Sequence, residues 1–339
     1  MSSPGRQQPT PQLFFETANA YQRTEALKAA VDLDVFTALG EGKTTITEIA
    51  HRTNASERGI RILCDFLCLM GFLTKDGQRY QLTPDAALFL DKNSPGYLGA
   101  SLEFLLSPTL TEGFKDLAAA VRKGGTVASA EGTIAPEHPI WVKFARAMTG
   151  MMAMPAQLMA SLITQNANRK LKILDIAAGH GLYGIAFATK HPETEVVALD
   201  WPNVLEVAKE NAAKAGVAER YQTKAGSAFD VDYGTGYDLV LLTNFLHHFD
   251  PPTCEKLLRK VHAALASNGR AIILEFVPNE DRISPPETAA FAMVMLGSTP
   301  AGDAYTFREL ENMCRAAGFT HSEIHQLPPS IQQVVIAQK

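Results

Sequence analysis

Glycines and a carboxylate meet in one stretch that has the pattern of a nucleotide-binding loop. The run "DIAAGHGLYGIAFA" at 175–188 contains Gly-His-Gly-Leu-Tyr-Gly, which fits G-x-G-x-x-G. Such a loop, placed between a strand and a helix, can hold the pyrophosphate of a dinucleotide. Here Asp175 ends the strand just before the glycines, and a carboxylate opposes a pyrophosphate. The same carboxylate would favour a ligand that carries positive charge.

A second carboxylate narrows the choice of ligand. Asp200 ends the apolar run "EVVALD", nineteen residues beyond Gly181, where an acidic side chain can accept hydrogen bonds from ribose hydroxyls. A cationic nucleoside without phosphate fits both carboxylates, which points to S-adenosylmethionine (SAM). Only one mononucleotide-type half precedes the end of the chain, whereas a dehydrogenase usually has two. A nicotinamide dinucleotide is the alternative, and NADH binding in place of S-adenosylhomocysteine would favour it.

Alternating strands and helices over about residues 168–339 must position this loop. The strand-like runs are 171–177, 195–200, 221–226, 237–244 and 270–277, and helical stretches lie at 182–190, 204–215, 253–266 and 306–317. Continuous apolar strands separated by amphipathic helices indicate an α/β, parallel, doubly wound sheet. The tail has "SEIHQL" and "QQVVIAQ" on either side of Pro328-Pro329, which predicts a terminal antiparallel pair.

The segment at 13–98 has the pattern of a winged helix. "ITEIAHRTN" and "SERGIRILCDFLCLMGFL" predict two helices joined by a turn, with Ser56 as the N-cap of the second. "LTKDGQRYQLT" then predicts a short hairpin with an Asp76-Gly77 turn. Residues 99–167 follow as a helical segment that is rich in Phe, Leu and Met.

DNA binding is the obvious function of a winged helix, but charge argues against it. Residues 40–92 contain seven Lys or Arg and seven Asp or Glu, whereas a surface that reads phosphates is basic. The second helix is also largely apolar, which suits burial against protein. A transcriptional regulator that uses SAM as its effector is the alternative of another class.

The overall composition excludes several further classes. The net charge of −5 gives no global attraction to nucleic acid or anionic membranes, and no window is long and apolar enough to span a bilayer. Residues 1–12 are polar and Pro-rich and lack the apolar core of a secretory signal. We therefore expect a disordered lead-in and a cytoplasmic protein. Cys64 and Cys68 share a helix face, and core packing explains them better than a metal pair.

Four motifs together resemble those of the small-molecule O-methyltransferases of the plant caffeic-acid and acetylserotonin type and their bacterial relatives. "ILDIAAGHG" corresponds to that family's Asp-x-Gly-Gly-Gly-x-Gly, with Ala177 and Ala178 at the first two glycine positions. "ALDWPNVLEVA" is similar to its "DLPxVxxxA", "LHHFDPPTC" to its "LHDWSDExC" and "RAAGF" at 315–319 to its "xxAGF". The resemblance covers the whole chain. It implies a homodimer with a winged-helix dimerisation domain and a class I methyltransferase domain at 168–339.

The resemblance also implies where SAM binds. Asp175, Gly179 and Gly181 match the loop around its methionine part, Asp200 matches the ribose acceptor, and Trp201 follows in position to pack on the adenine. Ser227 stands where the family has an aspartate for the adenine amine, so a weaker hydroxyl replaces a carboxylate. The complete set that we assign to SAM adds Ala177, Ala228, Phe229 and Asn244.

For catalysis, the resemblance implies a histidine base. His247 matches the family histidine that removes the proton from the acceptor hydroxyl, and Glu275 matches the glutamate that orients it. The family's second glutamate is missing, because Ala304 stands at its position and Tyr305 follows, with Asp303 next door. Either Asp303 substitutes, or His247 works with Glu275 alone, or the acceptor is not a simple phenol.

The resemblance finally implies metal-independent methyl transfer to a hydroxyl. The Met- and Phe-rich wall expected around the acceptor indicates an aromatic or polyketide-like molecule. The candidates for the acceptor pocket are apolar side chains that could equally be plain core: Phe144, Met148, Phe291, Met295 and Leu296. Some relatives methylate nitrogen or carbon and some bind SAM without methyl transfer, so these activities are alternatives.

Overall fold

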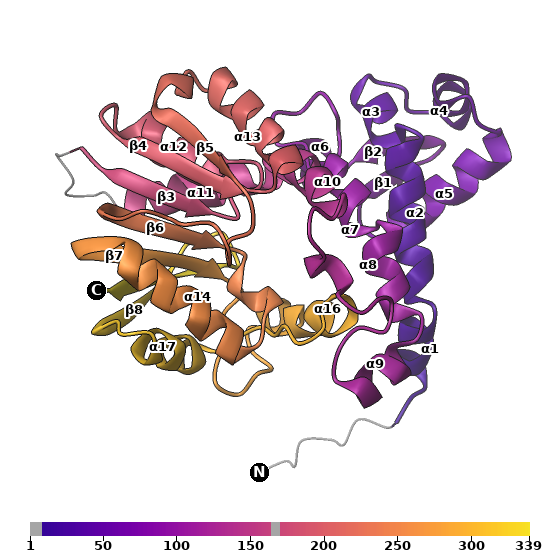
Figure 1. Cartoon of the computed structure of the whole chain (residues 1–339). Coiled ribbons are helices and arrows are strands. Elements are labelled where there is room, and N and C mark those ends of the chain that lie inside the picture. Colours follow the sequence, from indigo (N-terminus) through magenta and orange to yellow (C-terminus); the bar gives the residue numbers. More distant parts are fainter. Residues whose placement is uncertain (1–8, 164–169) are drawn as a thin grey trace, which may run out of the picture. The chain divides into compact units, whose positions relative to one another are not determined.

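The computed structural model describes residues 9–163 and 170–339 and divides into two compact units, with the boundary after Leu102. Figure 1 shows the N-terminal unit in indigo to purple and the second unit from magenta to yellow. The sequence predicts a boundary at 98 and a separate helical segment at 99–167; the boundary between the compact units lies four residues further along, and the described residues 103–163 belong to the second unit. The predicted boundary at 167 and most of the predicted lead-in lie outside the described residues.

The N-terminal unit consists of helices and one hairpin. Its elements are α1 (Gln12–Ala18), α2 (Ala20–Asp32), α3 (Val35–Gly40), α4 (Ile46–Thr53), α5 (Glu57–Leu69), β1 (Leu73–Asp76), β2 (Arg79–Leu82) and α6 (Pro84–Phe89). The two helices that the winged-helix pattern predicts are α4 and α5. Ser56 is the N-cap of α5, as predicted, and its side chain accepts the Gly59 N–H at 3.1 Å. The hairpin turn differs by one residue from the prediction. Asp76 pairs with Arg79, so Gly77 and Gln78 form the turn, with Gly77 at φ +56°.

Helix α5 has two apolar faces, and only one of them is buried within its unit. Ile60, Cys64 and Leu67 lie in the core at helical spacing, which is the packing role expected for Cys64. Ile62 and Leu69 remain exposed, Leu69 to 81%. An apolar helix face of this kind is a surface that a protein partner can cover.

The second unit begins with helices and continues as an α/β sheet. The helices before the sheet are α7 (Leu102–Leu105), α8 (Pro108–Thr111), α9 (Leu117–Lys123), α10 (Ile140–Ala147) and α11 (Thr149–Ile163). The helices within and after it are α12 (Leu182–Lys190), α13 (Pro202–Lys214), α14 (Pro251–Ala264), α15 (Pro286–Ala289), α16 (Phe291–Ser298) and α17 (Phe307–Ala316). The strands are β3 (Lys172–Ile176), β4 (Glu195–Asp200), β5 (Tyr221–Ala225), β6 (Tyr237–Thr243), β7 (Leu265–Glu275), β8 (His321–Gln326) and β9 (Gln333–Gln338).

The sheet confirms the predicted class. Its order is β5-β4-β3-β6-β7-β9-β8, parallel from β5 to β7, with β9 antiparallel to both β7 and β8. Side chains of α11, α12 and α13 pack on one face and those of α14 and α17 on the other. Within the described ranges, no helix has the length and apolarity needed to cross a membrane.

This topology gathers the polar residues of the sequence motifs. Since parallel strands all point the same way, the carboxyl ends of β3, β4, β6 and β7 meet at one edge of the sheet. Asp200 ends β4, Asn244 follows β6 and Glu275 ends β7. Helix α12 begins directly after the Gly-rich loop, so its N-terminus faces the same edge.

Candidate active site

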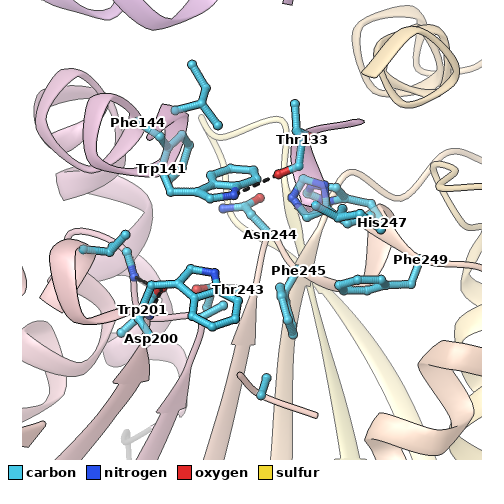
Figure 2. Close-up of a pocket in the computed structure, with 18 of the residues that line it drawn as sticks. Thr133, Trp141, Phe144, Asp200, Trp201, Thr243, Asn244, Phe245, His247 and Phe249 are labelled. Carbon is cyan, nitrogen blue, oxygen red and sulfur yellow. Dashed lines mark hydrogen bonds between the residues drawn. The ribbon is translucent and has the colours of Figure 1, made fainter. Parts of the chain in front are cut away.

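A cavity of about 730 Å³ opens at the carboxyl edge of the sheet, and its lining belongs entirely to the second unit. Strand ends form one wall, and helices α10, α11 and α16 contribute the other. In Figure 2, Asp200 and Trp201 lie on one side of the space and His247 on the other, with Asn244 between them. Trp141 and Phe144 of α10 lie above this space in the same view.

His247 and Glu275 form a buried pair in the cavity wall. His247 belongs to the short turn η5 (Leu246–His248) after β6, and the exposed fractions of His247 and Glu275 are only 4% and 3%. Glu275 Oε1 accepts the backbone N–H of Phe245 at 3.0 Å and of Leu246 at 2.9 Å, while Oε2 lies 2.5 Å from His247 Nδ1. A carboxylate only accepts, so the proton sits on Nδ1 and Nε2 keeps its lone pair.

Asp303 does not join this pair. Its carboxylate bonds Arg282 at 3.2 Å on the surface, is 40% exposed and lies outside the cavity lining. Only the backbone of Asp303 approaches the site, because its N–H donates to the His247 carbonyl at 3.0 Å. This corrects the expectation that Asp303 takes the place of the missing glutamate. Within the described residues, Glu275 is the carboxylate that bonds the His247 ring.

Asp200 is fixed by the backbone around it. Its Oδ2 accepts the Gly179 N–H at 2.8 Å and its Oδ1 accepts the Trp201 N–H at 2.7 Å. Burial raises the pKa of Asp200 to about 6, and the two backbone hydrogen bonds oppose this shift. Each carboxylate oxygen has a further lone pair that can accept from a ligand. Asp200 and Trp201 both line the cavity.

Asp175 and Gly181 lie behind the cavity wall. Asp175 is fully buried, its Oδ2 accepts the Gly184 N–H at 3.0 Å, and its Oδ1 has no partner among the described residues. Burial raises the pKa of Asp175 to about 7. At Gly181, with φ +76°, an added Cβ would lie 2.5 Å from the Tyr221 hydroxyl. Neither residue is in the cavity lining; both shape the loop, and their contact with SAM stays a prediction.

The other residues assigned to SAM all line the cavity: Ala177, Gly179, Ser227, Ala228, Phe229 and Asn244. Ala177 has φ +54°, a left-handed conformation at a position where the resembling motif has glycine. Ser227 Oγ accepts the Phe229 N–H at 3.1 Å, so it stabilises its own turn. Asn244 also has a positive φ of 54°, and its side chain donates to the Tyr183 hydroxyl at 3.4 Å and accepts from Gln332.

The acceptor side of the cavity is apolar. Four predicted residues line it: Phe144, Met148, Phe291 and Met295. Leu296 does not, which corrects its assignment. The lining residues of α16 recur at helical spacing as Phe291, Val294, Met295 and Ser298, so Leu296 lies on another face of that helix. Phe291 packs edge-on against the His247 ring, with 4.8 Å between ring centroids.

Several lining residues were not predicted as site residues from the sequence: Trp141, His180, Tyr183, His248 and Phe276. Two of them carried a usable signal. Trp141 lies three positions before Phe144 on α10, so both point the same way. His180 stands inside the Gly-rich loop itself. His248 is buried beside His247, with ring centroids 4.3 Å apart, and burial holds the pKa of His248 well below its usual range.

Comparison with known proteins decides the family. Residues 114–320 match the O-methyltransferase domain and residues 15–92 match the O-methyltransferase dimerisation domain. The chain belongs to the O-methyltransferase family. As an enzyme, this O-methyltransferase is SAM-dependent, which confirms the resemblance that its motifs indicated.

Three known proteins illustrate the similarity of this O-methyltransferase to its family. A 3-hydroxy-5-methyl-1-naphthoate 3-O-methyltransferase of Streptomyces sahachiroi is 28% identical over 314 residues, 91% of this chain and 89% of that one. An O-methyltransferase-like protein of Nostoc punctiforme, known as a crystal structure, is 58% identical with a TM-score of 0.96, over 98% of this chain and 100% of that one. Human N-acetylserotonin methyltransferase in complex with SAM shares the fold at 21% identity and a TM-score of 0.84, over 99% of each chain.

Proposed function

We propose that this enzyme transfers the methyl group of SAM to a hydroxyl of a neutral aromatic or polyketide-like molecule, with His247 as general base and without a metal ion. The observation that carries the proposal is the buried His247–Glu275 pair at the wall of a cavity. Figure 2 shows His247 across this cavity from Asp200 and Trp201. SAM supplies an electrophilic methyl group on a positively charged sulfur. The protein has to orient the two reactants and accept one proton.

The cofactor side of the cavity fits SAM. Asp200 keeps lone pairs for the two ribose hydroxyls, and Trp201 and Phe229 offer aromatic faces for the adenine. Three carboxylates line the cavity, at Glu131, Asp200 and Asp230. None of the described lining residues is Lys or Arg. The site is therefore electrostatically suited to a cationic ligand without phosphate groups.

His247 would act through Nε2. Glu275 holds the proton on Nδ1 at 2.5 Å, so Nε2 is free to accept the proton of a hydroxyl that approaches it. The carboxylate of Glu275 would then stabilise the positive ring that forms. Because a neutral hydroxyl is a poor nucleophile, removal of its proton during methyl transfer lowers the barrier.

The acceptor side favours an uncharged aromatic molecule. Phe291 stacks on Phe276 with ring centroids 4.0 Å apart, and Met148 and Met295 add flexible apolar surface. Since no described lining residue is cationic, nothing there compensates a carboxylate or phosphate on the acceptor. We expect an acceptor acid to react more slowly than its methyl ester.

With His247 as the base, we expect methyl transfer to need no metal ion. A histidine that accepts the hydroxyl proton makes activation of that hydroxyl by a metal ion unnecessary. We expect methyl transfer to continue unchanged in excess EDTA, and loss of activity that returns with added Mg²⁺ would contradict this part of the proposal.

We also propose a homodimer assembled through the N-terminal unit. Besides the exposed face of α5, helix α1 presents Leu13, Phe14 and Phe15 with 75%, 68% and 55% of their surfaces exposed. Such apolar surface is rare on a monomer and is typical of an interface. Light scattering at micromolar concentration should give twice the chain mass, and a monomer would contradict the assignment.

The decisive experiment measures methyl transfer from labelled SAM to a panel of phenols, amines and polyketides, with the wild type beside His247→Ala. We expect a methyl ether from the wild type and at least about a hundredfold loss in the variant, with unchanged affinity for S-adenosylhomocysteine. Product that survives the substitution would remove His247 as base. A methylated nitrogen or carbon, or no product despite SAM binding, would replace the O-methylation proposal.

A further inference from the structure

His180 is a buried side chain at the cavity for which the proposed reaction has so far no role. It lies between Gly179 and Gly181 in the loop before α12, its residue is only 2% exposed, and it lines the cavity. Its ring stacks on Phe144, with centroids 5.9 Å apart and planes inclined by 20°. The packing on Phe144 and the backbone of the loop therefore fix the orientation of the ring.

The hydrogen bonds of His180 determine which nitrogen can meet a ligand. Nδ1 accepts the backbone N–H of Leu182 at 3.2 Å. Burial lowers the pKa of His180 to about 4, so the ring is neutral at physiological pH and carries its single proton on Nε2. No described residue bonds Nε2, and Nε2 is not among the unpartnered atoms sealed from solvent. The Nε2–H is therefore a free donor at the cavity.

The free Nε2–H of His180 can donate a hydrogen bond to the negatively charged group of SAM. Besides its cationic groups, SAM carries one carboxylate on its methionine part. The described residues that line the cavity include no Lys or Arg, so neutral donors have to bind that carboxylate. The N-terminal end of α12 adds a favourable partial positive charge next to His180, and in its first turn Asp175 accepts the Gly184 N–H and His180 accepts the Leu182 N–H.

We propose that His180 binds the carboxylate of the methionine part of SAM through its Nε2–H. This inference rests on the proposed function, because it assumes that SAM occupies this cavity. With Asp200 at the ribose and His180 at the carboxylate, the middle of the ligand and its amino acid end are held by two residues of the cavity lining. His180 would then select for the intact amino acid end of SAM.

Two substitutions of His180 separate the ligand contact from the structural one. His180→Asn places an amide oxygen near the Nδ1 position, where it can still accept the Leu182 N–H, but it has no donor at the Nε2 position. His180→Gln places an amide N–H₂ near the Nε2 position and can still reach the ligand. The two variants therefore differ in whether they offer an N–H donor near the Nε2 position, which the proposal requires.

The test measures affinity by calorimetry for S-adenosylhomocysteine and for its decarboxylated analogue, S-adenosyl-3-thiopropylamine. We expect His180→Asn to weaken binding of S-adenosylhomocysteine about tenfold or more, the value of a hydrogen bond to a charged group. The analogue lacks the carboxylate, so its affinity should change less than about twofold. His180→Gln should recover most of the lost affinity.

The outcomes distinguish this proposal from the proposed function. An equal loss for both ligands, or no loss for either, would overturn the role of His180. If S-adenosylhomocysteine does not bind the wild type, the proposed function itself fails. Asp303→Asn serves as the control, because the Asp303 carboxylate bonds Arg282 at the surface and lies outside the cavity lining, so both affinities should stay unchanged. Should His180→Asn not fold, a wild type that fails to prefer S-adenosylhomocysteine over the analogue would still contradict the proposal.

Discussion

The two walls of the cavity are built by different means. On the cofactor wall and directly behind it, polar side chains bond the backbone: Asp200 in the wall accepts the N–H groups of Gly179 and Trp201, and Asp175 behind the wall accepts that of Gly184. The acceptor wall consists of apolar side chains such as Met148, in the turn between α10 and α11, and Met295 of α16. Hydrogen bonds to the backbone hold the side chains of the cofactor wall in one geometry. The flexible methionine side chains of the acceptor wall can adapt to ligands of several shapes.

The contrast explains how a common cofactor site can be combined with different acceptors. In the proposed function, the hydrogen-bonded wall holds SAM and the apolar wall fits the acceptor. The His247–Glu275 pair lies at the junction and is built like the cofactor wall, because Glu275 accepts backbone N–H groups as well as the ring. Substitutions on the two walls should therefore have effects of different size.

The largest effect is expected at Glu275. In Glu275→Gln the amide oxygen can keep the bonds to the Phe245 and Leu246 N–H groups, while the N–H₂ donates to His247 Nδ1 and moves the ring proton to Nε2. His247 would then have no lone pair for the substrate. We expect kcat to fall at least about a hundredfold with little change in cofactor affinity.

Asp303→Asn is the matched control for that substitution, since the Asp303 carboxylate bonds Arg282 at the surface. Its kcat should stay within about twofold of the wild type, because an exposed ion pair contributes little. A large loss at Asp303 together with a small one at Glu275 would reverse the assignment of the two carboxylates.

The second largest effect is expected on the free energy of unfolding, because the carboxylate of Asp175 is buried. The pKa of Asp175 is raised by burial to about 7 from an ordinary 3.8, so the folded state binds more protons than the unfolded state between these values. The free energy of unfolding therefore falls as pH rises from 4 to 7. We expect Asp175→Asn to raise this free energy by about 2 kcal/mol above pH 7.

Denaturant titrations at several pH values would measure this change. The advantage of Asp175→Asn should shrink as pH falls from 7 towards 4, because the wild-type carboxyl then keeps its proton in the folded state. A variant that is less stable than the wild type at every pH would show that the charge is not the source of the cost.

A third effect is expected at Asp200. In Asp200→Asn the amide N–H₂ cannot accept one of the two backbone N–H groups, of Gly179 or Trp201, and the negative charge is lost. Affinity for S-adenosylhomocysteine should fall about tenfold. Calorimetry would measure it, and an unchanged affinity would place the ribose elsewhere.

The smallest effect is expected on the acceptor wall. Met148→Leu keeps the apolar volume at a largely buried position of the cavity lining, and such swaps are well tolerated. KM for the acceptor should change less than about threefold, and cofactor affinity should not change. A tenfold loss at Met148 would mean that this wall is as rigid as the other one.

Periodicity predicted the sheet because its strands are continuous and apolar. Strands β3, β4 and β6 and helix α12 lie within one residue of the expected ranges, since their hydrophobic pattern depends on burial that any packing of this sheet requires. The start of β7 at Leu265 was missed by five residues, because "ASNG" is a polar stretch that only pairing with its neighbours makes a strand.

The sequence by itself determined the class of the fold and, through its motifs, the placing of Asp200, His247 and Glu275 at one edge of the sheet. Tertiary structure alone decided which neighbours point into the cavity. Asp303 turns to Arg282, Leu296 lies on the far side of its helix, and His180 keeps one nitrogen unpaired. The reason is physical: motif spacing fixes where a backbone passes, whereas a side chain's direction depends on partners distant in the chain.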